Sequence, residues 1–148
     1  MTQQNKPIAY TLFCDDIRYE RDHKYSALGV YQTALVLNCD ELELPKFVAL
    51  TVVELPSSVI GHSGSIRLLD GEDVLIEGGF AVPGPPEGHK VPHQFLASMP
   101  IEAVPFAAKV GMCLQVQFSI GEFQYVSPVL RIVRSEDVAS VEMEGAPL

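Results

Sequence analysis

The adjacent acids Asp15 and Asp16, with Arg18 close behind them, are the residues of this chain whose types best suit chemistry. Hard cations such as Ca²⁺ take several oxygen ligands, which loop carboxylates can supply. The acids that would have to provide such a ligand set are Asp15, Asp16, Asp70 and Asp73. No calcium-loop spacing joins them, so the site requires two distant turns to meet at one end of the fold. The competing interpretation, which we favour, is structural: a bulge in which an Asp–Arg pair and backbone hydrogen bonds hold a hairpin.

The histidines offer a weaker candidate for a metal site. His89 and His93 have the four-residue spacing that can bind zinc from one face of a helix. Pro92 and the prolines before it prevent that helix, and no third ligand is near in the sequence. We therefore interpret this segment as an exposed loop.

Nucleophilic catalysis finds little support either. Ser57-Ser58 and the segment 61–64 lack the Gly-x-Ser-x-Gly elbow and a following helix that could bind an anion. Cysteines occur in an odd number and without paired spacing, and no motif supplies a base to activate a thiol. They are Cys14, Cys39 and Cys113. The sequence thus predicts reduced thiols, no catalytic residue and no cofactor.

Composition narrows the classes of partner and the compartment. The chain has 148 residues, 47% hydrophobic and 20% charged, with a formal net charge of -9. Such an acidic protein repels nucleic-acid backbones and anionic membranes, so we predict that it binds neither. No apolar run reaches the 18 or so residues of a membrane span, and the polar start of the chain has no signal-peptide core. We therefore expect a cytoplasmic protein.

The elements that must position these residues read as short strands. Runs rich in β-branched and aromatic residues, bounded by Gly, Pro and Asp turns, are typical of strands. The runs, some of which continue one another, cover 8–13, 25–31, 34–39, 46–55, 65–69, 74–77, 94–98, 101–107, 113–120, 123–126 and 129–133. We expect the first strand to end at Asp15-Asp16, and Asp70-Gly71 to turn a hairpin.

Together these runs predict a single all-β domain. Strands at such short spacing, with no amphipathic helix, indicate a β-sandwich of about eight or nine mostly antiparallel strands. We place this sandwich at 8–134, between a flexible tail (1–7) and an acidic mobile tail (135–148). The prolines of the segment 83–86 keep that loop out of the sheets.

The opening of the chain also carries a resemblance. Phe-Cys-Asp-Asp-Ile-Arg at 13–18 and Lys-Tyr-Ser-Ala-Leu-Gly-Val-Tyr at 24–31 resemble the start of a family of uncharacterised bacterial and phage-encoded proteins, a domain of unknown function. The residues that carry the motif are Asp15, Asp16, Arg18, Lys24, Ser26, Gly29 and Tyr31. The resemblance implies an immunoglobulin-like or C2-like sandwich with no established activity. A role in a virion or in contact with a host is conceivable on this basis.

Two functional hypotheses follow. The first is a non-enzymatic protein-interaction or structural module whose partner is an unknown protein or a second copy of the chain. The apolar segments 80–83 and 103–108 are its candidate contact surfaces, and sandwich edges invite pairing between copies. The alternative is a divalent-cation-binding, C2-like domain or a metal-dependent enzyme that uses the loop aspartates.

Overall fold

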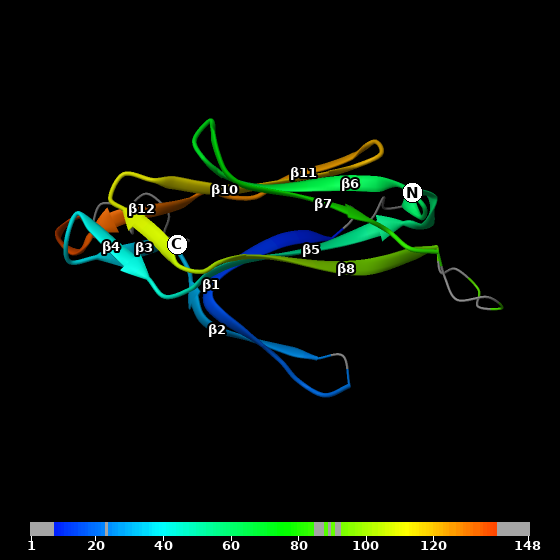
Figure 1. Cartoon of the computed structure of the whole chain (residues 1–148), viewed down its shortest axis with the longest axis horizontal. Coiled ribbons are helices and arrows are strands. Elements are labelled where there is room, and N and C mark those ends of the chain that lie inside the picture. Colours follow the sequence, from blue (N-terminus) through cyan, green and yellow to red (C-terminus); the bar gives the residue numbers. More distant parts are fainter. Residues whose placement is uncertain (1–7, 23, 85–87, 89, 91–92, 139–148) are drawn as a thin grey trace, which may run out of the picture.

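The computed structural model describes residues 8–22, 24–84, 88, 90 and 93–138. These residues form an all-β sandwich, as the sequence predicts, and Figure 1 shows its sheets lying one above the other. The predicted tail at 1–7 and most of the predicted C-terminal tail (139–148) lie outside the described residues. The same is true of Pro85, Pro86 and His89 in the proline-rich loop.

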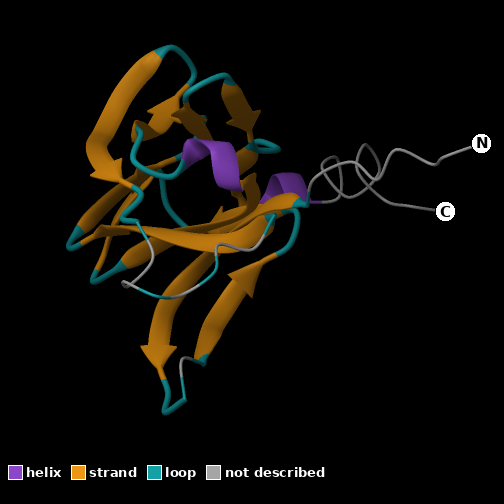
Figure 2. Ribbon diagram, turned by 90° about the vertical axis from the view of Figure 1, so that its right-hand side faces the viewer, coloured by secondary structure: helices purple, strands orange, loops and turns teal. Residues whose placement is uncertain are grey.

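More strands are present than the eight or nine expected, because several connecting segments pair as short strands. Within the described ranges they are β1 (Ala9–Tyr19), β2 (Tyr25–Tyr31), β3 (Ala34–Leu37), β4 (Glu41–Leu44), β5 (Phe47–Pro56), β6 (Ser63–Asp70), β7 (Asp73–Ala81), β8 (Gln94–Ala103), β9 (Phe106–Lys109), β10 (Cys113–Ile120), β11 (Phe123–Val126) and β12 (Leu130–Arg134). Short 3₁₀ turns, η1 (Ser57–Val59) and η2 (Ser135–Asp137), follow β5 and β12. Figure 2 separates these turns from the strands by colour.

The strands form two main sheets. Sheet A has the order β2-β1-β5-β8, and sheet B has the order β3-β12-β10-β6-β7 with β11 beside β10. A small third sheet pairs β4 with β9. Pairing is antiparallel throughout the described strands except between β12 and β3, which run parallel. The mostly antiparallel arrangement that the sequence predicts is thus confirmed.

The main core lies between sheets A and B. Phe47 of β5 is fully buried and stacks on Phe106, with ring centroids 4.7 Å apart, and on Phe13 at 6.0 Å. From the facing sheet, Phe118 stacks on Phe80 at 5.2 Å. Because each such side chain contributes roughly 2–3 kcal/mol by leaving water, this layer is what holds the sheets together.

A second, smaller apolar cluster lies on the outer face of sheet A. Val48, Leu50 and Val52 point away from the main core, yet they are almost fully buried. Cys14 and Ile17 of β1 cover them. In a straight strand, residues three apart point to opposite faces. These two share a cluster because β1 bends between them, which turns the β1–β2 hairpin away from the rest of sheet A (Figures 1 and 2).

The expected end of the first strand at Asp15-Asp16 is wrong, since β1 continues to Tyr19. The register shows why: Cys14 pairs with Val30 and Asp16 with Leu28, so pairing resumes directly beyond the bend. Gly29, on the opposite strand, has φ +66°. This left-handed conformation is one that glycine adopts without steric cost, and it allows both strands to bend together.

Two further expectations concern the segments on either side of the proline-rich loop. The hairpin at Asp70-Gly71 is confirmed, with Gly71 at φ +59°. The separate strands expected at 94–98 and 101–107 are wrong, because β8 runs unbroken through Pro100. Proline is tolerated here because β8 is an edge strand, and the missing N–H faces away from its neighbour β5.

Candidate functional site

The structure does not bring the predicted metal ligands together. Asp15 and Asp16 belong to β1 of sheet A, whereas Asp70 and Asp73 close the β6–β7 hairpin of sheet B. Asp70 is engaged locally, since its Oδ1 accepts a hydrogen bond of 2.9 Å from the backbone N–H of Cys113. Within the described residues, no three His, Cys, Asp or Glu side chains gather closely enough to hold a metal ion. The cation hypothesis therefore has no ligand set in this part of the chain.

Asp15 instead belongs to a local structural unit in the bend of the hairpin. The Tyr31 hydroxyl donates a hydrogen bond to Asp15 Oδ1. The carboxylate lies over Gly29, so closely that a Cβ at that position would sit 2.2 Å from Oδ2. Burial first, and then the hydrogen bond to this carboxylate, raise the pKa of Tyr31. Asp15, Gly29 and Tyr31 of the sequence motif thus fix the bend.

Asp16 forms an ion pair, but its partner is not the predicted Arg18. Lys46 Nζ lies 2.7 Å from Asp16 Oδ1 and 3.7 Å from Glu102 Oε1. The hydrogen bond from Lys46 is the main reason why the pKa of Asp16 is lowered, and the same contact raises the pKa of Lys46. The charge of Arg18 makes only a minor contribution to that lowering. Sequence analysis missed Lys46 because only the pairing of β1 with β5 brings it near.

The remaining motif residues hold the tip of the hairpin. Ser26 Oγ donates a hydrogen bond of 3.3 Å to Glu20 Oε1, and the Glu20 N–H donates one of 2.8 Å to the Lys24 carbonyl. These contacts hold the hairpin together, whereas the Asp–Arg pair of the favoured interpretation is replaced by the pair of Asp16 with Lys46. None of them presents a nucleophile or a base.

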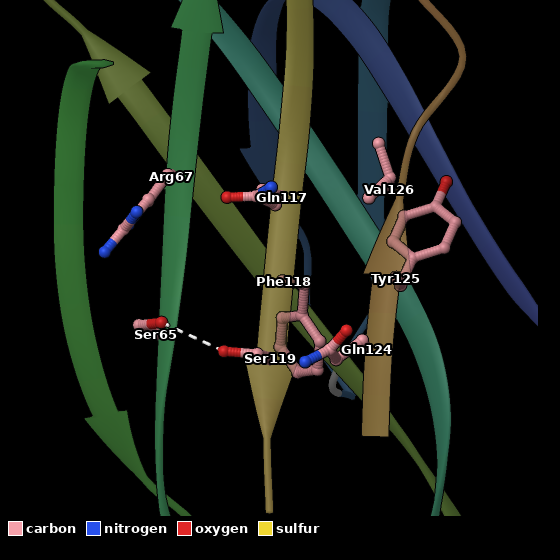
Figure 3. A pocket seen from close by; sticks show the side chains of 8 residues that line it. All are labelled: Ser65, Arg67, Gln117, Phe118, Ser119, Gln124, Tyr125 and Val126. Carbon is pink, nitrogen blue, oxygen red and sulfur yellow. Dashed lines mark hydrogen bonds between the residues drawn. The ribbon is translucent and has the colours of Figure 1, made fainter. Parts of the chain in front are cut away.

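A shallow polar hollow of about 230 Å³ lies on sheet B (Figure 3). Its floor includes Ser65 and Ser119, whose hydroxyl oxygens are 3.2 Å apart, and Gln117. The charge of Arg67 at its margin is paired with Glu77, at 3.1 Å. Phe118, Gln124, Tyr125 and Val126 also line it. A serine there would need a hydrogen-bonded base to attack a substrate, and among the side-chain hydrogen bonds of the described residues none joins Ser65 or Ser119 to such a base.

A second hollow, of about 520 Å³, brings together residues that could in principle support nucleophilic catalysis. Ser58, His62 and Glu122 all line it, although sequence analysis had dismissed the first two. All three are exposed. Among the side-chain hydrogen bonds of the described residues, none joins one of these three to another. A serine nucleophile needs a hydrogen-bonded base that is itself oriented by a third group, so this hollow lacks the required relay.

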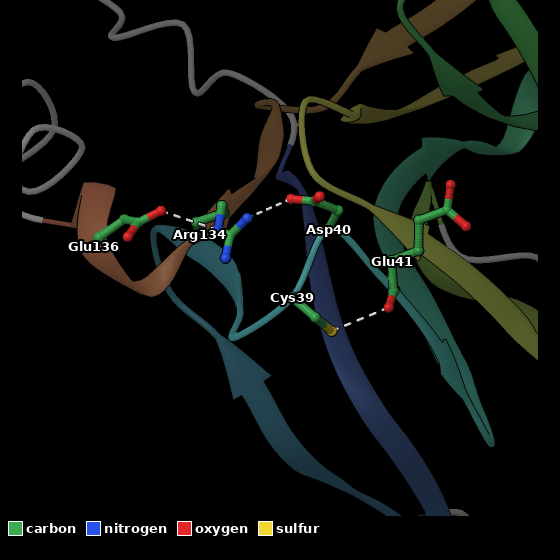
Figure 4. A network of polar contacts seen from close by, with 5 residues as sticks. All are labelled: Cys39, Asp40, Glu41, Arg134 and Glu136. Carbon is green, nitrogen blue, oxygen red and sulfur yellow. Dashed lines mark hydrogen bonds and ion pairs between the residues drawn. The ribbon is translucent and has the colours of Figure 1, made fainter.

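Another polar network lies outside the hairpin, a clamp at the end of β12 (Figure 4). Arg134 lies 2.5 Å from Asp40 Oδ1 and 3.0 Å from Glu136 Oε1, so it joins the β3–β4 turn to η2. Beside it, the Cys39 thiol contacts the carbonyl of Glu41 at 3.0 Å. The clamp fastens the end of the domain and has no hollow beside it among those described.

Exposed aromatic and apolar side chains gather instead on the outer side of sheet A. We call this region the tyrosine face and define it as Tyr10, Tyr19, Tyr25, Leu96 and Ser98. Tyr19 and Tyr25 are cross-strand neighbours in the hairpin, and with Ser98 of β8 they line a hollow of about 640 Å³. Tyr10 and Ser98 both pair with Val52, so they lie in one row across the sheet.

Two side chains of the tyrosine face contact each other, and two others are largely exposed to solvent. Burial, and then a hydrogen bond with the Tyr25 side chain, raise the pKa of Tyr10. Tyr19 is 66% exposed and Leu96 is 63% exposed. The face therefore presents apolar area to solvent without covering it.

The contact surfaces expected at 80–83 and 103–108 stay a prediction, because buried and exposed residues alternate along both segments and Val104 is 66% exposed. Their alternate residues face the core, as the strand period requires. The buried ones are Val82, Ala103, Phe106 and Ala108. Exposed tyrosines in the first two strands were a sequence signal for the tyrosine face that sequence analysis did not use.

Comparison of the chain with family models, with curated proteins and with solved structures finds no match. The resemblance of residues 13–31 to an uncharacterised family thus stays a prediction. In the part of the chain that the structure describes, no helix is long and apolar enough to cross a bilayer.

Proposed function

We propose that this chain is a non-enzymatic structural module that assembles with protein chains through sheet A, a second copy of the chain being the partner. The observation that carries this proposal is the exposure of the tyrosine face together with the adjacent edge strand β8. From Gln94 to Ile101 this strand has no charged residue. Exposed apolar side chains that gather on one face mark sites of protein association, and here the charged residues Glu20, Asp22 and Lys24 line the same hollow as Tyr19 and Tyr25.

The chemistry of the tyrosine face favours a protein surface over other partners. Tyrosine buries a large apolar ring at low conformational cost and keeps a hydroxyl for a hydrogen bond, which is why it is enriched at protein interfaces. The net charge of -9 disfavours nucleic acid and anionic membranes. A cytoplasmic setting, in which the three free cysteines stay reduced, belongs to the same proposal. The resemblance to a bacterial and phage-encoded family is compatible with it.

The second hypothesis, cation binding or metal-dependent catalysis, has no specific observation in its favour. Its proposed ligands are divided between the two sheets, and Asp15, Asp16 and Asp70 already have the partners described above. We therefore advance only the assembly module.

Light scattering coupled to size-exclusion chromatography tests the proposal, over a range of protein concentrations and with either Ca²⁺ or EDTA. We expect a mass above the 16.2 kDa of one chain that does not depend on metal. The variant Tyr19→Ser should weaken association, whereas Val129→Ser, at an exposed position on sheet B's side, should not. A monomer at every concentration, or association that calcium controls, would overturn the proposal.

A further inference from the structure

We infer that β8 is the assembly edge: two copies pair their β8 strands antiparallel about a two-fold axis at Leu96, so that their A sheets become continuous. This inference rests on the proposed function and specifies its interface. An unpaired edge strand offers a row of backbone donors and acceptors to another strand. The partner is a second copy because the residues of β8 are complementary to themselves.

The free side of β8 can be identified from its hydrogen bonds. The Ser57 N–H donates a hydrogen bond of 2.9 Å to the carbonyl of His93. The backbone N–H and C=O groups of the odd-numbered residues of β8 therefore point toward β5. The register, with Met99 opposite Thr51, continues this pattern along the strand. In an antiparallel strand the N–H and C=O of one residue point to the same side. Gln94, Leu96 and Ser98 therefore direct theirs toward the free edge.

The order of polar and apolar residues around Leu96 is the same when it is read in either direction. Gln94 and Ser98 are polar, Phe95 and Ala97 are apolar, and Leu96 stands at the centre. Antiparallel self-pairing about Leu96 sets each residue against one of its own class. Leu96 meets the partner's Leu96 on the outer face, and Phe95 meets the partner's Ala97 on the inner face. Phe95 and the partner's Ala97 form a non-hydrogen-bonded pair, in which the two backbones approach closely. A large side chain opposite a small one fits in that space.

Burial supports this arrangement. Leu96 is 63% exposed, and Phe95, Ala97 and Met99 are only half-buried although they face the interior of the sandwich. Sheet B thus leaves the inner side of β8 incompletely covered. A partner strand beside β8 would cover both faces of the edge at once.

Pro100 restricts the register to pairings centred before Ala97. A proline has no N–H to donate, and its position is one of those facing the free edge. Pairing centred on Leu96 uses the free groups of Gln94, Leu96 and Ser98 in both copies and leaves Pro100 outside. Pairing centred on Ala97 or Ser98 would place Pro100 within the ladder, where it loses a hydrogen bond in each copy.

Charge is compatible with self-pairing at this edge. The stretch from Gln94 to Ile101 is uncharged, so two acidic molecules can meet there without opposing carboxylates. Because the whole chains still repel one another, association should strengthen as salt rises and screens the net charge.

Edge variants form the first test, with the dimer dissociation constant measured by sedimentation. Leu96→Lys should raise this constant at least tenfold, because it places a like charge at the two-fold axis. Val74→Lys is the matched control: Val74 is an exposed apolar residue of β7, the edge strand of sheet B, and its replacement should leave the constant unchanged. Ser98→Pro should also abolish pairing, yet keep the unfolding midpoint, because the deleted N–H faces away from β5.

Cross-linking tests the register. In a Cys39→Ser, Cys113→Ser background, Leu96→Cys should form a disulfide across the axis on mild oxidation, since directly opposed Cα atoms are about 5.5 Å apart. Ser98→Cys, on the same face of the same strand, is the control. Its partner would be displaced by four residues, about 13 Å along the strand, and should not cross-link.

The outcomes separate this inference from the proposed function. A dimer that cross-links at Leu96→Cys and not at Ser98→Cys supports both. A dimer that fails to cross-link at Leu96→Cys, or that survives Leu96→Lys, overturns the β8 interface and leaves the assembly function standing. A monomer under all conditions, high salt included, overturns both.

Discussion

Gly29→Ala is the substitution whose effect the structure specifies most fully. At φ +66° the backbone of Gly29 is left-handed, and an added Cβ would lie 2.2 Å from Asp15 Oδ2 and 3.2 Å from Asp15 Cβ. Alanine must therefore accept an unfavourable backbone conformation and also displace the Asp15 side chain. Displacement breaks the hydrogen bond from Tyr31, which holds the bend of the hairpin.

The magnitude follows from these two costs. A left-handed conformation at a residue with a Cβ costs about 1 kcal/mol. Loss of an exposed side-chain hydrogen bond costs about 1 kcal/mol more. We expect Gly29→Ala to lower the free energy of unfolding by about 2 kcal/mol in total.

Urea denaturation followed by circular dichroism measures this loss, with Gly71→Ala as the control. Gly71 has a similar φ of +59°, but nothing lies within 4 Å of its Cβ position. Its replacement therefore reports the backbone cost alone, about 1 kcal/mol. Both variants reduce the entropy of the unfolded chain alike, so their difference isolates the contact with Asp15.

Measuring Gly29→Ala in an Asp15→Ala background completes a double-mutant cycle. There Gly29→Ala should cost only a little more than Gly71→Ala, because the carboxylate is gone and only the Cβ of residue 15, 3.2 Å away, still opposes the added methyl group. Equal losses for the two glycine variants in the otherwise wild-type chain would refute the placement of Asp15 over Gly29, and with it our account of the bend.

Three further predictions concern the core and the two paired acids. Phe47→Ala should lower the free energy of unfolding by about 3–5 kcal/mol, because it removes a fully buried ring that stacks on Phe106; a loss below 1 kcal/mol in urea denaturation would contradict this packing. The raised pKa of Tyr31 stabilises the fold fully below about pH 10, the ordinary tyrosine value, and this contribution is lost as pH rises through the folded-state pKa. Between pH 8 and 11 the unfolding midpoint of Tyr31→Phe should therefore fall less steeply than that of the wild-type chain. Identical slopes for the two proteins would count against this role of Tyr31. Lys46→Gln should raise the pKa of Asp16 toward its ordinary value, since Lys46 supplies the hydrogen bond that lowers it; NMR titration of the Asp16 carboxyl would show no change if Lys46 were not the partner.

Local patterns were enough to identify many of the strands. The alternation of Leu114, Val116, Phe118 and Ile120 with polar residues predicted β10, and every one of these four side chains is buried. The Asp-Gly turn predicted the β6–β7 hairpin. Such features are encoded by neighbouring residues, whose periodicity and turn preferences act over a few positions.

The candidate site was less accessible to such reasoning. The motif residues Asp15, Gly29 and Tyr31 meet in the bend of the hairpin, but Lys46 was missed and Arg18 was assigned in its place. The error has a physical cause: Arg18 is near in sequence, whereas Lys46 is brought near only by the pairing of β5 with β1. The tyrosine face likewise combines residues of β1, β2 and β8.

The sequence by itself thus determined an all-β sandwich and the acidity of the chain, because composition, period and turn chemistry are local properties. Tertiary structure alone decided that β1 bends at Asp15, that β12 pairs parallel with β3, and that β2 and β8 are left at the edges of sheet A. Strand order depends on which apolar faces bury one another across long loops, and that is a property of the whole chain rather than of any segment.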